Sequence, residues 1–137
     1  MAHAPRGRRT TGKMTLRLHH IALRARDPSA TTAFYASVIG LPEVRRDTER
    51  RSFWLEARGV VLMIEQAEPG EPLVPPDSKE LLAFAIDDRE AWRLRLAAAG
   101  VAIEAETPNT LYFRDPDGRR VAVSTYAFSL AGEPSTR

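Results

Sequence analysis

The sequence predicts an α+β fold built from two βαβββ modules, and three observations lead to that prediction. An alternating segment ends at Asp27, and a helix-like stretch and Gly40 follow it. The same order recurs from Leu81 through Asp87 to Gly100, and in both copies the Asp and the Gly lie 13 residues apart. Each copy continues with three more alternating segments. Duplicated units usually share one core or one cavity, so residues at matched positions bear on function.

Length and composition exclude several classes of protein. The chain has 137 residues, enough for one domain with its own core, and 43% of them are hydrophobic. There is no cysteine, which excludes disulfides, thiolate metal sites and cysteine nucleophiles. No apolar run approaches the roughly 20 residues that span a bilayer, so we expect no membrane association. Residues 1–13 lack the apolar core of a secretory signal, and we expect a cytoplasmic protein.

The first module is predicted at residues 15–66, after a disordered tail at residues 1–14. Asp27 is the expected N-cap of its helix, with Pro28 at the first helical position and Gly40 at the end. Period-2 alternation and turn residues place the strands of this module at residues 17–25, 43–47, 51–57 and 60–66.

The second module is predicted at residues 80–127, after a Pro-rich linker at residues 67–79 and before a tail at residues 128–137. Asp87 is the expected N-cap of its helix, with Glu90 as its partner three residues on. The strands are expected at residues 80–86, 101–105, 109–114 and 119–126. Residues 115–118, Asp-Pro-Asp-Gly, favour a turn between the last two strands because proline presets one dihedral angle and glycine accepts a positive one.

Strand alternation assigns one face of each sheet to the helix and the other to a cavity. The apolar sets that should pack under the helices are Ile21, Leu23 and Ala25, then Val60, Leu62 and Ile64, then Leu82, Phe84 and Ile86, and finally Val121 and Val123. The alternate residues then face the cavity. They include His20 and Arg24, Met63 and Glu65, Leu81, Ala122 and Tyr126.

Three segments in this order resemble the vicinal oxygen chelate superfamily, which includes glyoxalase I, bleomycin resistance proteins and extradiol dioxygenases. They are residues 19–23 (His-His-Ile-Ala-Leu) before Asp27, Ala33-Phe34-Tyr35 leading to residues 38–41, and residues 113–118. The resemblance covers about residues 17–127. It implies a half-open curved mixed sheet around a cavity, often completed at a dimer interface.

The resemblance also implies where a metal would bind: one ligand from the first strand and one from the fourth strand of each module. His20 resembles the first ligand and Glu65 the second, although a shift of two residues puts Met63 there. The third position is Leu81 and the fourth is Ala122, so half of the donors are missing.

Two further donors could complete that shell only through a distortion. His19 and His20 are neighbours on a strand and should point to opposite faces, and Glu80 could contribute only if its strand shifted by one residue. We therefore expect no cofactor, although a divalent metal held by His20, Glu65 and substrate oxygens stays possible.

The expected function is to bind a small organic molecule as a homodimer. Candidate ligand-binding residues are Arg24, Trp54, Met63, Leu81, Tyr112, Ala122 and Tyr126. Arg24 needs a partner on the cavity face, and Glu65 or an anionic ligand could serve. The alternative is a metal-dependent lyase, isomerase or dioxygenase in which His20 and Glu65 are catalytic.

The arginine-rich hairpin of Arg45, Arg46, Arg50 and Arg51 is expected to be a solvated loop. No basic stripe follows a predicted helix, and we expect no nucleic-acid binding.

Overall fold

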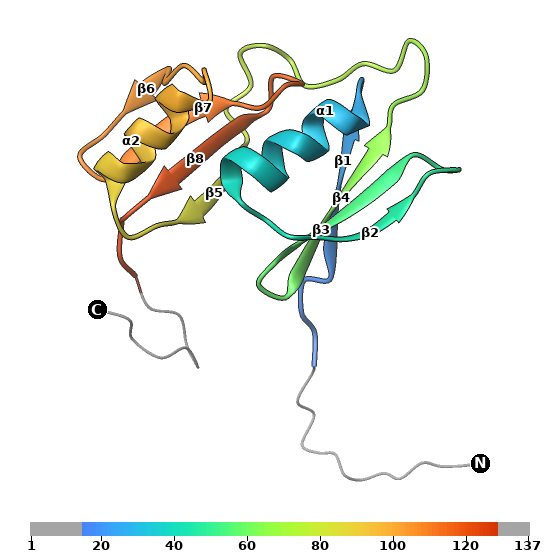
Figure 1. Cartoon of the computed structure of the whole chain (residues 1–137), viewed down its shortest axis with the longest axis horizontal. Coiled ribbons are helices and arrows are strands. Elements are labelled where there is room, and N and C mark those ends of the chain that lie inside the picture. Colours follow the sequence, from blue (N-terminus) through green and yellow to red (C-terminus); the bar gives the residue numbers. More distant parts are fainter. Residues whose placement is uncertain (1–14, 129–137) are drawn as a thin grey trace, which may run out of the picture.

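The computed structural model describes residues 15–128 and shows two four-stranded mixed sheets, each covered by a helix on one face (Figure 1). The strand orders are β1-β4-β3-β2 and β5-β8-β7-β6. The first and last strands of each module are parallel neighbours, and the other pairs are antiparallel. The prediction of an open α+β fold with two βαβββ modules is confirmed. The expected tail at residues 1–14, and residues 129–137 of the other, lie outside the described residues.

The elements follow the predicted order with shorter strands. The first module contains β1 (His20–Ala25), α1 (Pro28–Ala33), its π-helical continuation η2 (Phe34–Ile39), β2 (Glu43–Asp47), β3 (Ser52–Ala57) and β4 (Val60–Gln66). The second contains β5 (Leu81–Ala85), α2 (Arg89–Ala98), β6 (Ala105–Glu106), β7 (Thr110–Arg114) and β8 (Arg120–Ser124). The strand predicted at residues 101–105 is wrong for most of its length, because Val101 and Ile103 pack against the core instead of pairing. No helix among residues 15–128 is long and apolar enough to cross a membrane.

The two helices begin at different points of the repeat. Asp27 caps the first by accepting a hydrogen bond from the Ala30 N–H, as predicted. The second is capped by Asp88, which accepts from the Ala91 N–H at 3.0 Å, so the prediction of Asp87 is wrong. The cap and the closing glycine are thus one residue further apart in the first module. The wider turn of η2 accommodates that extra residue.

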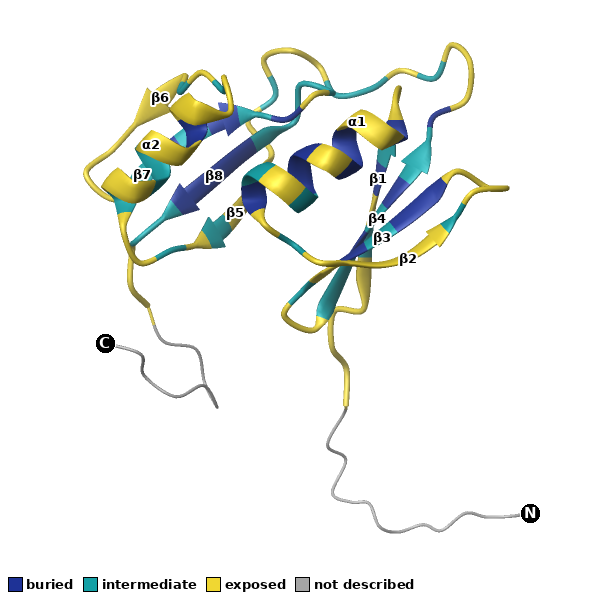
Figure 2. Cartoon of the chain, in the orientation of Figure 1, coloured by how far each residue is buried: buried dark blue, intermediate teal, exposed yellow. Residues whose placement is uncertain are grey.

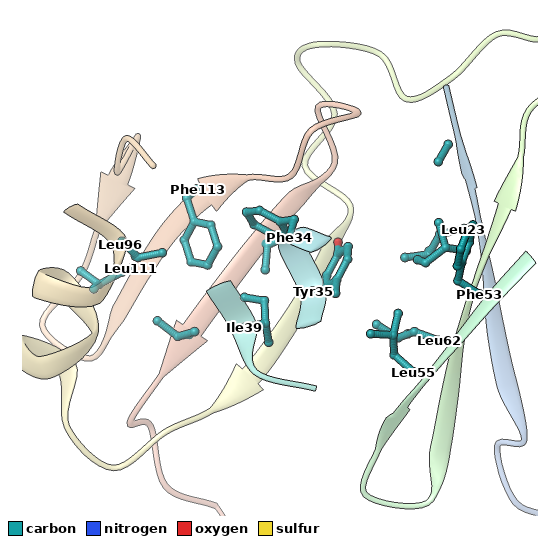
Figure 3. Close-up of a cluster of buried hydrophobic side chains, with 14 residues drawn as sticks. Leu23, Phe34, Tyr35, Ile39, Phe53, Leu55, Leu62, Leu96, Leu111 and Phe113 are labelled. Carbon is teal, nitrogen blue, oxygen red and sulfur yellow. The ribbon is translucent and has the colours of Figure 1, made fainter. Parts of the chain in front are cut away.

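The helix-covered faces of both sheets share one hydrophobic core. Figure 3 shows Phe34 and Tyr35 between Leu23 of the first module and Phe113 of the second. Some of the residues predicted under the helices are fully buried, including Leu62, Ile64, Val121 and Val123, and the others are partly buried, among them all three predicted on β5. In Figure 2 buried residues follow α1, β3 and β8, whereas β2 and β6 are exposed. Because the covered faces meet in this core, the open face of each sheet points away from it.

A buried polar network, which we call the interlock, joins the two modules. The Tyr35 hydroxyl on η2 donates to Asp115 Oδ2 at 2.7 Å, and Arg119 Nη1 donates to the same oxygen at 2.6 Å. Arg119 Nη2 also donates to the Arg24 carbonyl of β1 at 2.9 Å. Burial, reinforced by the Asp115 charge, raises the pKa of Tyr35 above its usual range. The phenol therefore remains a hydrogen-bond donor at neutral pH.

The predicted turn at residues 115–118 provides the second half of the interlock. Gly118 adopts a φ of 86°, which the turn requires. This conformation lets Asp117 reach the first module, where it accepts from the Thr31 hydroxyl at 2.6 Å and from the Arg26 backbone N–H at 2.9 Å. The turn is therefore a docking element as well as a strand connection.

The start of the linker is tied to β1 by a clamp between Arg24 and Glu71. Arg24 donates from Nε and Nη2 to the two carboxylate oxygens of Glu71, both at 3.0 Å. The Glu68 N–H donates to the same carboxylate at 2.8 Å. The hydrogen bonds from Arg24, and then that from Glu68, lower the pKa of Glu71 to about 2.

We expect Tyr35→Phe to destabilise the protein, because the change leaves a buried Asp115 oxygen short of one donor. The expected loss is about 1–3 kcal/mol in the free energy of unfolding, measured by denaturant titration. Tyr126→Phe is the control, because Tyr126 is 64% exposed and its hydroxyl makes no hydrogen bond to a carboxylate of residues 15–128. Equal stability of the two variants would contradict a stabilising role for the Tyr35 hydroxyl.

We expect Glu71→Gln to change how stability depends on pH. The folded pKa of about 2 lies below the value of about 4.3 for an unfolded glutamate. The clamp therefore contributes stability above about pH 4 and loses it as the pH falls toward 2. The free energy of unfolding should fall less steeply with acid in Glu71→Gln than in wild type. Glu49→Gln, in an exposed turn, should follow the wild-type curve, and identical curves for both variants would count against the clamp.

Candidate ligand-binding site

The open face of the first sheet holds a half-enclosed concavity of about 700 Å³. Strand register arranges its side chains in rows across the sheet. The middle row crosses Ala22, Met63, Trp54 and Arg45. The next row crosses Arg24, Glu65, Ser52 and Asp47. The concavity thus brings together four of the predicted site residues, namely Arg24, Trp54, Met63 and Glu65.

Trp54 and Met63 form the apolar part of this floor. They are register partners on β3 and β4, and both are half-buried. The indole N–H of Trp54 donates to the Ser52 hydroxyl at 3.2 Å, which fixes the ring. The Arg45 guanidinium lies over the ring, 5.0 Å from its centroid. An aromatic face beside a thioether is a surface on which a flat organic molecule can be buried.

Arg24 forms the charged wall, and its hydrogen-bonding capacity is largely used within the protein. Its Nη1 donates to Glu65 Oε1 at 3.0 Å, while Nε and Nη2 hold Glu71. These carboxylates, Glu71 first, raise the pKa of Arg24 above its usual range. Glu65 is thereby paired with a permanent cation. The pairing uses one oxygen of the carboxylate and gives Glu65 a role within the protein that requires no metal.

His20 lies on the same open face but far from Glu65. It is paired in register with Val61, whereas Glu65 is paired with Arg24, four residues further along β1. At about 3.3 Å per residue the two positions are about 13 Å apart. Both ligands of one metal ion lie within about 2.3 Å of it, so His20 and Glu65 do not reach a common ion.

His20 instead meets its neighbour in the chain. His19 Nδ1 lies 2.9 Å from His20 Nδ1, and the two rings are nearly perpendicular. The prediction that they point to opposite faces is therefore wrong. The physical reason is that β1 begins at His20, so His19 precedes the strand and is free of its alternation.

Register also identifies the first-module equivalent of Ala122. Ala22 and Ala83 each lie five residues before their helix cap, and they pair with Met63 and Ala122 respectively. The second ligand position of the resemblance therefore falls on Met63 rather than on Glu65. This is the two-residue shift that the sequence left open.

The donor set of the four positions does not fit a divalent metal. His20 alone offers a nitrogen, Met63 offers a weak thioether donor, and Leu81 and Ala122 offer nothing. Adding His19 gives two imidazoles, still short of the three or four donors that such a site needs. Within residues 15–128 no three His, Asp or Glu side chains could hold one ion together.

The remaining predicted residues lie on the second sheet and do not join the concavity. Leu81 is exposed, Ala122 is fully buried beside its register partner Tyr112, and Tyr126 lies beyond the end of β8. The Tyr112 ring is covered by the guanidinium of Arg120, 4.2 Å from its centroid. These residues therefore belong to a different sheet from the one that holds the concavity.

Sequence reasoning missed two residues that shape the site. Arg45 is expected in a solvated loop, yet β2 carries it over Trp54 into the concavity. Alternation along β2 against Trp54 could have indicated it. Glu71 holds Arg24 from inside the Pro-rich linker, where no periodic pattern marks it.

Comparison with known proteins agrees with this architecture. The profile of the Glyoxalase/Bleomycin resistance protein/Dioxygenase superfamily matches residues 17–123. The chain is similar to the fosfomycin resistance protein FosX from Mesorhizobium loti, with 24% identity, a TM-score of 0.71, and coverage of 84% of this chain and 95% of that one. It is also similar to TnmS3, an antibiotic-binding protein from Streptomyces sp. CB03234, with 20% identity, a TM-score of 0.66, and coverage of 82% and 98%.

A third solved structure bears on metals. It is a point mutant of the fosfomycin resistance protein FosX from Listeria monocytogenes, complexed with Mn(II) and a dihydroxypropylphosphonic acid. It shares 19% identity and a TM-score of 0.68, with coverage of 85% of this chain and 94% of that one. At these identities the likeness concerns the fold, and metal use by a relative sets no ligand in this chain. The profile, by contrast, spans well over half of the sequence, and the protein therefore belongs to the glyoxalase/bleomycin resistance protein/dioxygenase superfamily.

Proposed function

We propose that this protein binds a small organic molecule on the open face of its first sheet and needs no metal to do so. The observation that carries the proposal is the concavity floored by Trp54 and Met63, beside a charged wall in which Arg24 is already paired with carboxylates of the protein itself. Burial of a flat apolar ligand would supply the affinity, and the surrounding polar groups would orient it. An antibiotic-binding protein of the same fold supports this interpretation.

A metal-dependent lyase, isomerase or dioxygenase is the alternative that the superfamily makes available. It would use His20 and Glu65 with substrate oxygens. The strand register places these two side chains four residues apart along the sheet, and Glu65 already accepts a hydrogen bond from Arg24. The observations therefore favour a binding protein.

We further propose that the protein is a homodimer in which β1 of one copy lies beside β5 of the other. Both are edge strands, and both carry small alanines on their open faces, Ala22 on β1 and Ala83 on β5. A two-fold arrangement pairs both edges at once and extends each open sheet with the partner's open sheet. The concavity of one copy would then be continued by the Tyr112 face of the other.

A planar neutral probe, 4-nitrobenzamide, should bind saturably and quench the emission of Trp54. The chain has two tryptophans, which allows a matched pair of variants. Trp92→Phe removes a residue of α2, outside the concavity, and should keep both binding and quenching. Trp54→Phe should weaken binding by about tenfold or more, because it removes much of the stacking surface.

The same titration separates the binding protein from the metal enzyme. Binding should be unchanged by EDTA and by His20→Ala, with calorimetry giving the dissociation constant. Stoichiometric metal in the purified protein that is lost in His20→Ala would reverse the proposal. So would equal affinity of the probe for the two tryptophan variants.

The dimer can be tested at its proposed strand edge. The N–H groups of Val61 and Ala67 donate to the carbonyls of His19 and Ala25, so the odd-numbered residues of β1 direct their backbone groups toward β4. Backbone groups alternate along a strand, and the N–H of Ala22 therefore points outward from the edge. Ala22→Pro removes that N–H without breaking a bond inside the chain. Light scattering after size exclusion should give twice the chain mass of 15.3 kDa for wild type and a single mass for the variant.

Ala83→Pro serves as the second variant, because the proposed interface pairs β1 of one copy with the edge of β5 in the other. Circular dichroism should show that both variants remain folded. A monomeric wild type, or folded variants that remain dimeric, would contradict the proposed pairing.

A further inference from the structure

The structure places the same device, a guanidinium on an aromatic ring, at equivalent points of the two open faces. Arg45 covers Trp54 in the first sheet, and Arg120 covers Tyr112 in the second. The two rings are equivalent because Trp54 pairs with Met63 as Tyr112 pairs with Ala122. A guanidinium that lies on a ring presents its N–H groups at the edge of the stack, where an acceptor can reach them.

The two arginines differ in how their charge is balanced. Arg120 Nε donates to Glu104 at 2.8 Å, and Glu104 is shared with Arg114 at 2.9 Å. These bonds, that to Arg114 first, hold the pKa of Glu104 at about 2, so the carboxylate stays ionised. Arg45 has no carboxylate within 4.0 Å among residues 15–128, and its ring contact carries no neutralising charge.

The other charges of the concavity are either paired or at its rim. Arg24 is held by Glu65 and Glu71, and Asp47 lies 4.0 Å from the Arg50 guanidinium and accepts from the Arg50 N–H. The remaining lining carboxylates, Glu49 in the turn after β2 and Glu68 after β4, are exposed side chains at the ends of strands. Among residues 15–128, Arg45 is thus the arginine of the lining that has no ion-pair partner, and it lies directly on the aromatic floor.

We propose that Arg45 makes the site selective for aromatic acids: a flat ring that carries a carboxylate or a comparable anion. This inference rests on the function proposed above and adds the chemical class of the ligand. The ring would lie against Trp54 and Met63, and the anion would accept hydrogen bonds from the Arg45 edge.

The test compares two probes of the same shape, 4-nitrobenzoate and 4-nitrobenzamide, by calorimetry on the full-length protein. Wild type should bind the benzoate about tenfold more tightly, since a hydrogen bond to a charged group is worth more than one to a neutral group. Arg45→Met keeps an unbranched apolar cover on Trp54 but removes the charge. It should abolish the preference by weakening the benzoate about tenfold, while the amide changes by less than about twofold. Arg45→Lys keeps a cation and should restore part of the preference.

Arg46→Met is the matched control. Arg46 is the next residue of β2 and also stacks on an aromatic ring, that of Phe53, but on the helix-facing side of the sheet and with Glu43 as its partner. It should leave the preference intact. Equal affinities of the two probes in wild type, or an equal loss in both variants, would overturn the role of Arg45 and leave the binding function standing. Absence of binding by either probe would reject the site and the selectivity together.

Discussion

The whole arrangement depends on a buried acid, Asp115, placed where two modules of one chain meet. Its side chain is fully buried, which would be costly for an isolated charge. Its own module satisfies it through Arg119 and the backbone N–H groups of the turn, and Tyr35 of the first module adds a further donor when the modules dock. The interlock therefore fixes which faces of the sheets meet. The helix-covered faces converge, and the open faces are left to bind other molecules.

The interlock also reaches the candidate site through a short chain of contacts. Arg119 donates to the backbone carbonyl of Arg24 at 2.9 Å, and the Arg24 side chain holds Glu65 and Glu71. The position of the charged wall is thus set by the same residues that dock the modules. The contacts of Arg24 therefore have a structural explanation that requires no ligand. Arg45 has no such carboxylate partners among the described residues.

The sequence was sufficient for the fold and for which side of each strand is buried, because both follow from local periodicity. Leu23, Ile64 and Val123 are buried as alternation requires. It was not sufficient for register between strands, which depends on contacts far apart in the chain. Met63 and Glu65 face the same side, and only pairing with β1 shows which of them is equivalent to Ala122.

Local exceptions defeated the remaining predictions. His19 does not follow strand alternation because it precedes β1. The prediction of Asp87 as the second cap relied on equal spacing in the two modules, but the first module holds one more residue between cap and glycine. The hairpin arginines form one charged cluster in the sequence. In the sheet, alternation sends Arg45 to Trp54 on the open face and Arg46 to Phe53 on the covered face. Neighbouring residues of one type therefore have opposite environments.

The duplicated modules differ at residues that line their open faces. At equivalent register positions, the first sheet has Trp54 and Met63 where the second has Tyr112 and Ala122. Tyr112 lies beneath an arginine whose charge Glu104 neutralises, and no comparable carboxylate balances Arg45 among the described residues. A metal site of this superfamily takes donors from both modules, whereas an aromatic floor with one arginine above it takes residues from a single module. The loss of donors in the second module is therefore compatible with a ligand site that the first module supplies almost alone.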